Sequence, residues 1–426
     1  MSRTPSSARR FAGPRIVAVT MLVMAAAFGL NFAAGLFLAP LSARYGWGVG
    51  ALSMAAAANT AVSGLLQPVV GVLVDRVGPR LVLAAGLSLL VACYLLLAGV
   101  EQLWQFLLVY PLLGGAGFAG AATLANSVLV SRWYVRDRTR MLARTTAGIN
   151  LGQLLVLPSA GWLIAGYGTS TAYLVLGMVV ALTAVPAAAL LLRNNPAELA
   201  QVPDGADRDS AAGLAADGAV LPPAVLTRRR RLAVASFGMH ALSLYFVVLH
   251  LPRYATDLGG GVSTGGQVLA VAAAASAVMM IITGRLVNRF GRDRLLLALH
   301  VVRGVSLLLA AFCTGASQLF GFAVLFGLAS FPVIPLTVAV LSVGRAPASL
   351  GRLMGFVWLL HQTCAGVGVL AGGLTRSLTG TYRPYFVVAA AVMTVSSLLL
   401  WRLAGDRDPL PPATPTEPTP TSPVIA

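Results

Sequence analysis

Long apolar segments follow one another along the chain, and they restrict its fold more than any other feature. Segments of roughly 20 residues, the length that crosses about 30 Å of hydrocarbon, can be drawn twelve times in the 426 residues. In chain order they are 16–40, 50–74, 80–100, 103–130, 140–165, 170–192, 232–255, 265–287, 294–315, 318–342, 353–375 and 383–404. Because a backbone in lipid must satisfy its polar groups internally, we expect twelve transmembrane helices.

Composition agrees with a membrane protein and not with a soluble one. Hydrophobic residues make up 58% of the chain and charged residues 10%, whereas about a quarter of the residues in a soluble domain are charged. The formal net charge of +17 comes from arginines scattered between the apolar segments, which argues against nucleic acid as a partner. We therefore expect the chain to sit in a lipid bilayer.

The arginines are distributed unevenly between the loops that join these segments. Most lie at the N-terminus and in alternate loops, at 76–80, 132–140, 228–231, 285–294, 345–352 and 402–407. The other loops contain only Arg44, Arg253, Arg376 and Arg383. Since loops rich in positive charge stay in the cytoplasm, both termini and the central loop are predicted to be cytoplasmic, in a multi-pass protein of the cell (plasma or inner) membrane.

A short motif occurs twice, half a chain apart. Gly71-Val-Leu-Val-Asp-Arg-Val-Gly78 is matched by Gly284-Arg-Leu-Val-Asn-Arg-Phe-Gly291, an offset of 284 − 71 = 213 residues. Its glycines allow a tight turn between two apolar segments. We infer two similar halves. The predicted parts are an N-terminus 1–15, a six-helix bundle 16–192, a linker 193–231, a second six-helix bundle 232–404 and a disordered tail 405–426.

This motif, extended to Arg80, resembles the signature loop of the major facilitator superfamily. The resemblance implies an all-α membrane fold of two pseudo-symmetric six-helix bundles. It also implies a conformational latch, in which the acid of the motif pairs with an arginine of a neighbouring helix and with a helix end. The residues assigned to the latch are Asp75, Arg76, Gly71, Gly78, Arg80 and, from the second copy, Arg289. The second copy has Asn288 in place of the acid, which predicts a weaker latch.

Further motifs are similar to the monocarboxylate-transporter-like branch of that superfamily, including its bacterial oxalate:formate antiporter-like members. They are the segment Asn31 to Trp47, the loop Ser131 to Arg138, the stretch His250 to Gly259 and the pair His361-Gln362. The resemblance implies alternating access, in which one central site opens to either side in turn, and a small organic anion as substrate. Carriers of this branch hold the anion with a cationic side chain in helix eight or eleven, whereas here helix eleven offers His361 and Gln362.

Polar side chains near the middle of a membrane span are costly, so they usually face a partner or a water-filled cavity. The substrate-binding candidates are therefore His361, Gln362, Arg303, Asn31, Asn126, Asn150, Gln153 and Tyr245. His361 could bind a carboxylate when protonated or exchange a proton, since no acid lies well inside a span. Arg303 has two interpretations, because helix nine is peripheral in the family that the chain resembles. It contacts the substrate, or it bonds to backbone carbonyls of a neighbouring helix.

Other classes of function find no support in the sequence. The chain has no Lys and therefore no Gly-x-x-x-x-Gly-Lys-[Ser/Thr] nucleotide-binding motif. Cys93, Cys313 and Cys364 lie in separate apolar segments without metal-ligand spacing. We expect a secondary transporter that acts as a monomer and is not an enzyme, and we expect no cofactor or metal. Its substrate is a small molecule, and one alternative is that a proton is transported together with it. The alternative is efflux of a drug-like apolar or cationic compound, for which the lack of mid-membrane acids is unfavourable.

Overall fold

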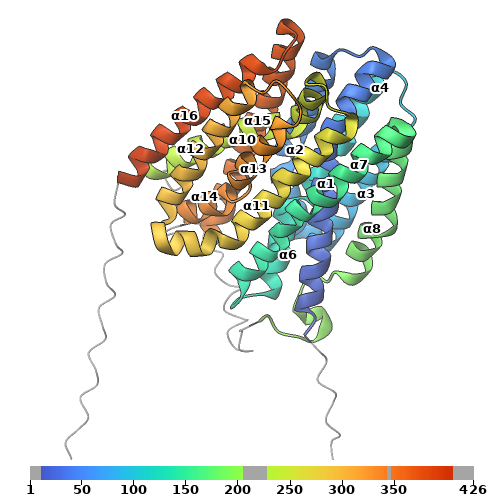
Figure 1. Cartoon of the computed structure of the whole chain (residues 1–426). Helices are drawn as coiled ribbons and strands as arrows, with labels where there is room; N and C mark the ends of the chain where they lie inside the picture. The colour runs from blue at the N-terminus through green and yellow to red at the C-terminus, as the bar shows by residue number, and fades with distance from the viewer. Residues whose placement is uncertain (1–10, 205–227, 343–346, 406–426) are drawn as a thin grey trace, which may run out of the picture.

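The structure of the protein is a computed structural model, which describes residues 11–204, 228–342 and 347–405 (Figure 1). In this part of the chain the fold is almost entirely helical. Eleven helical segments are long and apolar enough to cross a membrane. One of them, Arg140–Leu191, has 52 residues, more than twice the roughly 20 that one crossing needs.

The 52-residue segment contains two crossings. Its backbone leaves the helical conformation at Gly168, where φ is +82° and ψ is 172°. Glycine adopts this positive φ without a side-chain clash, so the chain can turn back there. Gly168 falls between the predicted segments 140–165 and 170–192. The prediction of twelve transmembrane helices is therefore confirmed.

The first bundle contains six crossings, some of them made of several helical pieces. Their elements are α1 (Gly13–Tyr45), α2 (Val49–Val77), α3 (Pro79–Leu97), α4 (Leu103–Val109), the π-helix η1 (Tyr110–Gly114), α5 (Gly115–Ala121), α6 (Thr123–Trp133), α7 (Arg138–Leu182), α8 (Ala184–Pro186) and η2 (Ala187–Leu191). A short 3-10 helix, η3 (Pro196–Leu199), follows. The fourth crossing runs from α4 to α6, and the fifth and sixth share α7.

The second bundle repeats this arrangement. Its elements are α10 (Arg228–Asp257), α11 (Val262–Phe290), α12 (Arg292–Ala311), α13 (Gln318–Leu328), α14 (Val333–Ser342), α15 (Pro347–Thr379) and α16 (Arg383–Gly405). α13 and α14 form one crossing that is interrupted between Leu328 and Val333. Most helices extend past their predicted ends, so that α1 begins at Gly13 instead of residue 16 and α10 at Arg228 instead of residue 232.

The two copies of the repeated motif form the same turn. Gly78, between α2 and α3, has φ 88° and ψ 153°, and Gly291, between α11 and α12, has φ 83° and ψ 152°. Only glycine adopts this backbone region readily, which explains why both copies end in that residue. The sequence repeat therefore corresponds to a repeat in structure.

The two bundles meet along one half of their length and separate along the other (Figure 1). We call the side on which α1 begins and α16 ends the terminal side, and the other the opposite side. On the opposite side, α1 packs on α10, α2 on α15 and α7 on α11. Toward the terminal side the bundles separate, and apolar residues of these helices such as Val69, Ile281 and Phe356 are exposed. The molecule is closed on the opposite side.

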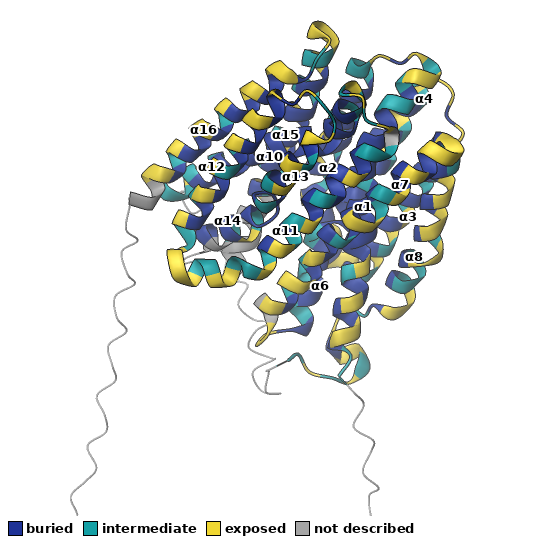
Figure 2. Ribbon diagram, viewed as in Figure 1, coloured by how far each residue is buried: buried dark blue, intermediate teal, exposed yellow. Residues whose placement is uncertain are grey.

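Burial is arranged as a bilayer requires. Buried residues line the interior of each bundle, and exposed ones cover its outside (Figure 2). Many exposed residues are large and apolar, for example Leu182 and Phe312, which are 70% and 71% exposed. In water such a surface would be unfavourable, whereas in lipid it costs nothing.

Candidate functional site

The bundles enclose a small cavity at the place where they meet. Its volume is about 20 Å³, enough for roughly one water molecule. It is lined from α1, α2 and η1 of the first bundle and from α10 and α15 of the second. The lining residues are Asn31, Phe32, Ala56, Asn59, Thr60, Tyr110, Tyr245, Val248, Leu249 and Val369. Two predicted substrate contacts, Asn31 and Tyr245, therefore face one cavity from opposite bundles.

The wall from the first bundle is polar but uncharged. The Asn59 amide donates to the carbonyl of Tyr110 at 2.9 Å, in the π-helix where the regular α-helical hydrogen bonds are interrupted. The Thr60 hydroxyl donates to the carbonyl of Ala56 at 2.9 Å, which leaves its oxygen able to accept. Asn31 Oδ1 has no partner among the described residues. This wall can therefore bind a polar ligand.

The wall from the second bundle connects the cavity to His361. His361 Nδ1 lies 3.2 Å from Gln362 Oε1. Gln362 is within hydrogen-bonding reach of Tyr245 and packs against Gly64 of α2, so it stands at the junction of the two bundles. His361 and Gln362 are 1% and 3% exposed. Three predicted contacts thus form one chain that ends at the cavity, although His361 itself does not line it.

Three other predicted contacts lie away from the cavity. Asn126 donates to the carbonyls of Ala121 and Ala122, at the break between α5 and α6. Asn150 and Gln153, both on α7, are buried, and Asn150 Oδ1 and Gln153 Nε2 have no partner among the described residues. The position of Asn126 is that of a residue which satisfies an interrupted helix.

Arg303, on α12, is fully buried and spans the gap to the broken tenth crossing. Its Nε and Nη2 donate to the carbonyl of Ala329 at 3.1 and 2.7 Å, and Nη2 also donates to the hydroxyl of Ser330 at 2.9 Å. Nη1 donates to Ser243 Oγ of α10 at 3.3 Å. The guanidinium carbon lies 4.5 Å from the ring centroid of Phe326. Arg303 thus satisfies the backbone carbonyl that the break between α13 and α14 exposes.

The charged residues Asp75, Arg76 and Arg289, which the sequence assigns to a latch, do not pair with one another in the described ranges. Asp75 and Arg76 are exposed, and Asp75 has no ion pair within the described ranges. Arg289 is exposed as well and lies over the ring of Phe290. Gly71 has open space around it. The state that is closed on the opposite side therefore leaves the acid of the motif free.

Arg80, which is also assigned to the predicted latch, makes contacts within the first bundle. Its Nε donates to the carbonyl of Ala189 in η2 at 2.8 Å, and its backbone N–H donates to Asn194 Oδ1 at 2.9 Å. Gly78 lies directly against the Asn194 side chain. These contacts join the start of α3 to the end of the sixth crossing within the first bundle.

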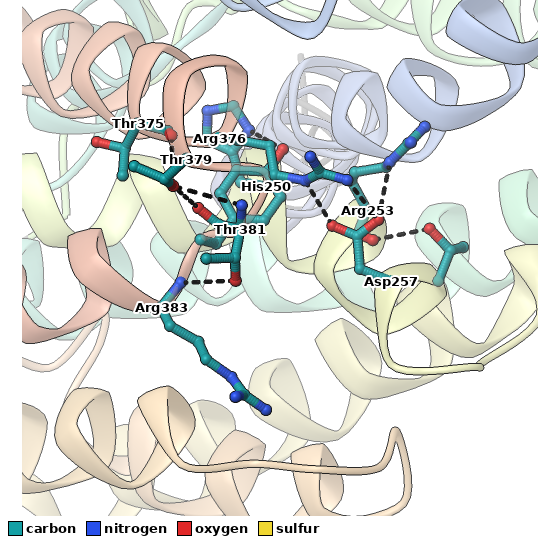
Figure 3. A network of polar contacts seen from close by, with 10 residues as sticks. His250, Arg253, Asp257, Thr375, Arg376, Thr379, Thr381 and Arg383 are labelled. Carbon is teal, nitrogen blue, oxygen red and sulfur yellow. Dashed lines mark hydrogen bonds and ion pairs between the residues drawn. The ribbon is translucent and has the colours of Figure 1, made fainter.

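A polar network closes the second bundle on the opposite side (Figure 3). Asp257 at the end of α10 accepts from Arg376 Nε of α15 at 2.8 Å and from Arg253 Nε at 3.3 Å. His250 Nε2 lies 2.9 Å from the Val369 carbonyl and Nδ1 lies 3.1 Å from the Tyr382 hydroxyl. Because a carbonyl only accepts, Nε2 carries the proton and Nδ1 accepts from Tyr382.

The linker begins with a contact to the terminal side of the first bundle. The backbone carbonyl of Asp204 accepts from the N–H groups of Val135 and Arg136, and its N–H donates to the Trp133 carbonyl. Asp204 Oδ2 accepts from the Asp137 N–H at 3.0 Å. Burial, together with the charge of Asp204, raises the pKa of Tyr134. Residues 205–227 of the predicted linker, 1–10 of the predicted N-terminus and 406–426 of the predicted tail lie outside the described residues.

Two bundles of six membrane-crossing helices around a cavity that is closed on one side define a multi-pass membrane transporter. The chain belongs to the Major Facilitator Superfamily, whose family model matches residues 19–357 and 234–426. The membership of the superfamily that the motifs indicated is thereby confirmed.

The names of the relatives do not agree on one substrate class, and one relative is an uncharacterized transporter. It is 26% identical to the MFS-type transporter YcxA of Bacillus subtilis (strain 168), over 84% of this chain and 86% of the relative. It is 26% identical to monocarboxylate transporter 13 of Rattus norvegicus, over 91% and 88%. It is 24% identical to the multidrug resistance protein MdtG of Salmonella paratyphi C (strain RKS4594), over 80% and 81%.

A solved structure has the same fold. The nucleoside transporter NupG superimposes with a TM-score of 0.69 over 92% of this chain and 99% of its own, at 12% sequence identity. At this identity the similarity concerns the fold alone. The expected architecture of two six-helix bundles is confirmed, and the family does not consist of enzymes.

Proposed function

We propose that the protein is a secondary transporter that carries a small, monocarboxylate-like organic anion across the cell membrane by alternating access. One observation carries the proposal. No Asp or Glu is among the buried side chains of the described residues, and Arg303 is the single buried charged side chain there. The interior therefore has a positive potential, which favours an anion over a cation. Similarity to monocarboxylate transporter 13 supports the same substrate class.

The proposed binding site is the cavity together with its neighbours on α15. Asn59 Nδ2, Tyr245 and Gln362 supply hydrogen-bond donors, and Phe32 provides an apolar wall. A carboxylate has two oxygens that accept such bonds, while its hydrocarbon part would pack on the aromatic ring. In the described state the cavity is too small for such a ligand, so binding requires the bundles to move further apart on the terminal side.

The proposed cycle uses the latch to distinguish two states. If both termini are cytoplasmic, the described state is open toward the cytoplasm, and Asp75 is free in it. When the bundles come together on the terminal side, Asp75 would pair there with an arginine and a helix end. The latch would then stabilise the state that is open on the opposite side.

A second candidate is efflux of an uncharged, drug-like compound. The aromatic lining of Phe32, Tyr110 and Tyr245 favours it, since such rings pack on apolar ligands of many shapes. Similarity to the multidrug resistance protein MdtG points the same way. A cationic compound is disfavoured by the same lack of buried acids.

Transport into proteoliposomes tests the proposal. Purified protein is reconstituted and offered radiolabelled acetate, lactate, pyruvate and benzoate, with ethidium and an uncharged dye in parallel. We expect saturable movement of at least one acid, and Gln362→Leu should weaken its binding about ten- to hundredfold through loss of a charge-assisted hydrogen bond. Ser88→Ala is the control, because the Ser88 hydroxyl is exposed on α3 and donates to the Ala84 carbonyl of its own helix. Movement of the dyes without any acid would favour efflux instead.

A further inference from the structure

Three of the four histidines of the chain lie together inside the second bundle. They come from three helices: His240 from α10, His300 from α12 and His361 from α15. The ring centroids of His240 and His300 are 6.0 Å apart, and those of His240 and His361 are 6.3 Å apart. Each of the three is at most 1% exposed. We call them the histidine cluster.

The cluster has hydrogen-bonding capacity that the surrounding protein does not use. Both ring nitrogens of His240 and Nε2 of His361 have no partner among the described residues. The fourth histidine, His250, is equally buried but has both nitrogens bonded. A buried polar atom without a partner carries its full desolvation penalty, so the cluster would be stabilised by a ligand that its nitrogens can hold.

A metal ion does not fit this arrangement. No group of three or more His, Cys, Asp or Glu side chains with metal-binding geometry occurs in the described part of the chain. A proton needs no cavity, and it binds to the lone pair of a neutral imidazole nitrogen. The N–H that it forms can then donate to a neighbouring ring. The cluster therefore suits a proton better than a metal.

The groups around the cluster determine when a proton can bind. Among the described residues, Arg303 on α12 is the only charged side chain buried near it. The other titratable groups are Tyr245 of α10, 6.0 Å from His361 between ring centroids, and Cys364 of α15, which faces Gly238. Ser330, in the break between α13 and α14, and Met393 of α16 also lie there and do not titrate. A proton would thus be repelled by Arg303 with no acid to offset it.

A transported anion would supply the missing negative charge. Gln362 links His361 to Tyr245 and to the cavity, so a carboxylate bound there lies about one side chain away from the cluster. Two unit charges roughly 6 Å apart at an effective dielectric constant of about 20 strengthen each other's binding roughly a hundredfold. The linkage is reciprocal, so the proton raises the affinity for the anion as much as the anion raises the affinity for the proton.

We propose that His240, His300 and His361 form a single proton-binding site, off the substrate cavity, which takes up one proton together with the anion. The proposal rests on the proposed function for the identity of the anion. The proton comes from water and goes to an unpaired nitrogen of the cluster, and it leaves when the anion leaves. A second proton is excluded by repulsion from the first and from Arg303.

Proton uptake can be counted by calorimetry. Binding of acetate, lactate, pyruvate and benzoate to the purified full chain is measured at pH 7 in two buffers of different ionisation enthalpy. We expect close to one proton taken up per bound anion. The double variant His240→Gln/His361→Gln should take up almost none, whereas His250→Gln should take up as many protons per bound anion as the wild type, since both nitrogens of His250 are already bonded. Size-exclusion chromatography and thermal unfolding verify that each variant is folded.

Two results would overturn the proposal: anion binding without proton uptake in the wild type, or unchanged uptake in His240→Gln/His300→Gln/His361→Gln. A second readout needs no anion. The rings of Trp358 and His361 lie 5.0 Å apart, and a protonated imidazole quenches tryptophan fluorescence. Acidification should quench Trp358, seen as the difference from Trp358→Phe, and His361→Gln should remove that step. If none of the acids binds but acidification still quenches Trp358, the proton site stands and the proposed substrate class fails. If acidification does not quench Trp358, the proton site fails.

Discussion

The closed side should open when a single methyl group is added at Gly35. Gly35 of α1 lies so close to α10 that an added Cβ would stand 2.4 Å from the Leu249 carbonyl oxygen and 2.9 Å from its Cα. Ordinary contact begins at 3.4 Å, so the backbones would have to move apart by about 3.4 − 2.4 = 1.0 Å. Because the obstacle is backbone, no side chain can rotate away to make room.

The size of the effect follows from the cost of overpacking, which is about 1–3 kcal/mol. In Gly35→Ala this cost falls on the state that is closed on the opposite side. The state in which α1 and α10 are apart does not have this cost. The population open on the opposite side should therefore rise about five- to hundredfold. Alanine also has the higher helix propensity, but that gain is shared by both states and does not change their ratio.

Thiol labelling measures the shift. In a background without the three native cysteines, Thr60→Cys places a thiol in the cavity, and a membrane-impermeant maleimide is added on the opposite side. Gly35→Ala should label faster than its parent by the factor given above. Gly266→Ala should do the same, because its Cβ would lie 2.6 Å from the Leu157 carbonyl oxygen of α7.

Gly321→Ala is the matched control. Gly321 is a helical glycine of α13, and no neighbouring atom lies within 4 Å of the place that an added Cβ would take, so the methyl group meets nothing. Its labelling rate should equal that of the parent. Equal rates for Gly35→Ala and Gly321→Ala would refute the idea that close backbone contact seals this side.

Three further outcomes are expected. Arg303→Met should lower the stability by about 1–3 kcal/mol, since it leaves the buried Ala329 carbonyl unpaired; thermal unfolding in detergent would show this, and no loss would contradict the role of Arg303 as a clamp. Asp75→Asn should slow transport and favour the state described here while leaving substrate affinity in each state nearly unchanged, which transport and equilibrium binding together would check. A cysteine at position 210 should react only with reagents that reach the cytoplasm, and labelling from outside intact cells would contradict the predicted orientation.

The crossings could be predicted because the signal for them is local. An apolar run of about 20 residues is visible in the sequence itself, and the split at Gly168 lies in a gap between two such runs. The ends of the helices are predicted less accurately than the crossings themselves. α1 continues to Tyr45, past the apolar run that stops at residue 40, because Arg44 and Tyr45 can reach the membrane interface and Gly46 ends the helix with φ 69°.

The composition of the site could be predicted only in part, because it depends on which helix faces are brought together. Asn59 and Thr60 line the cavity, yet in sequence they are merely two polar residues in an Ala-rich segment. Tyr110 lines it because a π-helix turns the fourth crossing there. Polar residues beside Pro in a membrane span, as at Tyr110-Pro111, would have been a usable signal.

Arg303 illustrates a different limit. In the sequence, its position near mid-membrane favours a ligand contact and a structural role about equally, and nothing in the segment that forms α12 distinguishes the two roles. The deciding feature lies 26 residues later, where the break after Leu328 leaves the Ala329 carbonyl without a helical partner. The histidine cluster is similar, since it unites three helices that are far apart in sequence.

The ranking of His361 over Arg303 as the contact for anion or proton can be tested by one pair of substitutions. His361 reaches the cavity through Gln362 and holds that amide by a 3.2 Å contact, whereas the donors of Arg303 are engaged with Ala329, Ser330 and Ser243. If the anion binds best with a protonated cluster, its affinity should fall as pH rises through the pH at which the cluster loses its proton. His361→Gln should remove that pH dependence and cost about ten- to hundredfold in affinity at low pH, the value of a charge-assisted hydrogen bond. If His361→Gln retains both the affinity for the anion and its pH dependence, while a folded Arg303→Gln binds no anion, then Arg303 and not His361 is the contact for the anion.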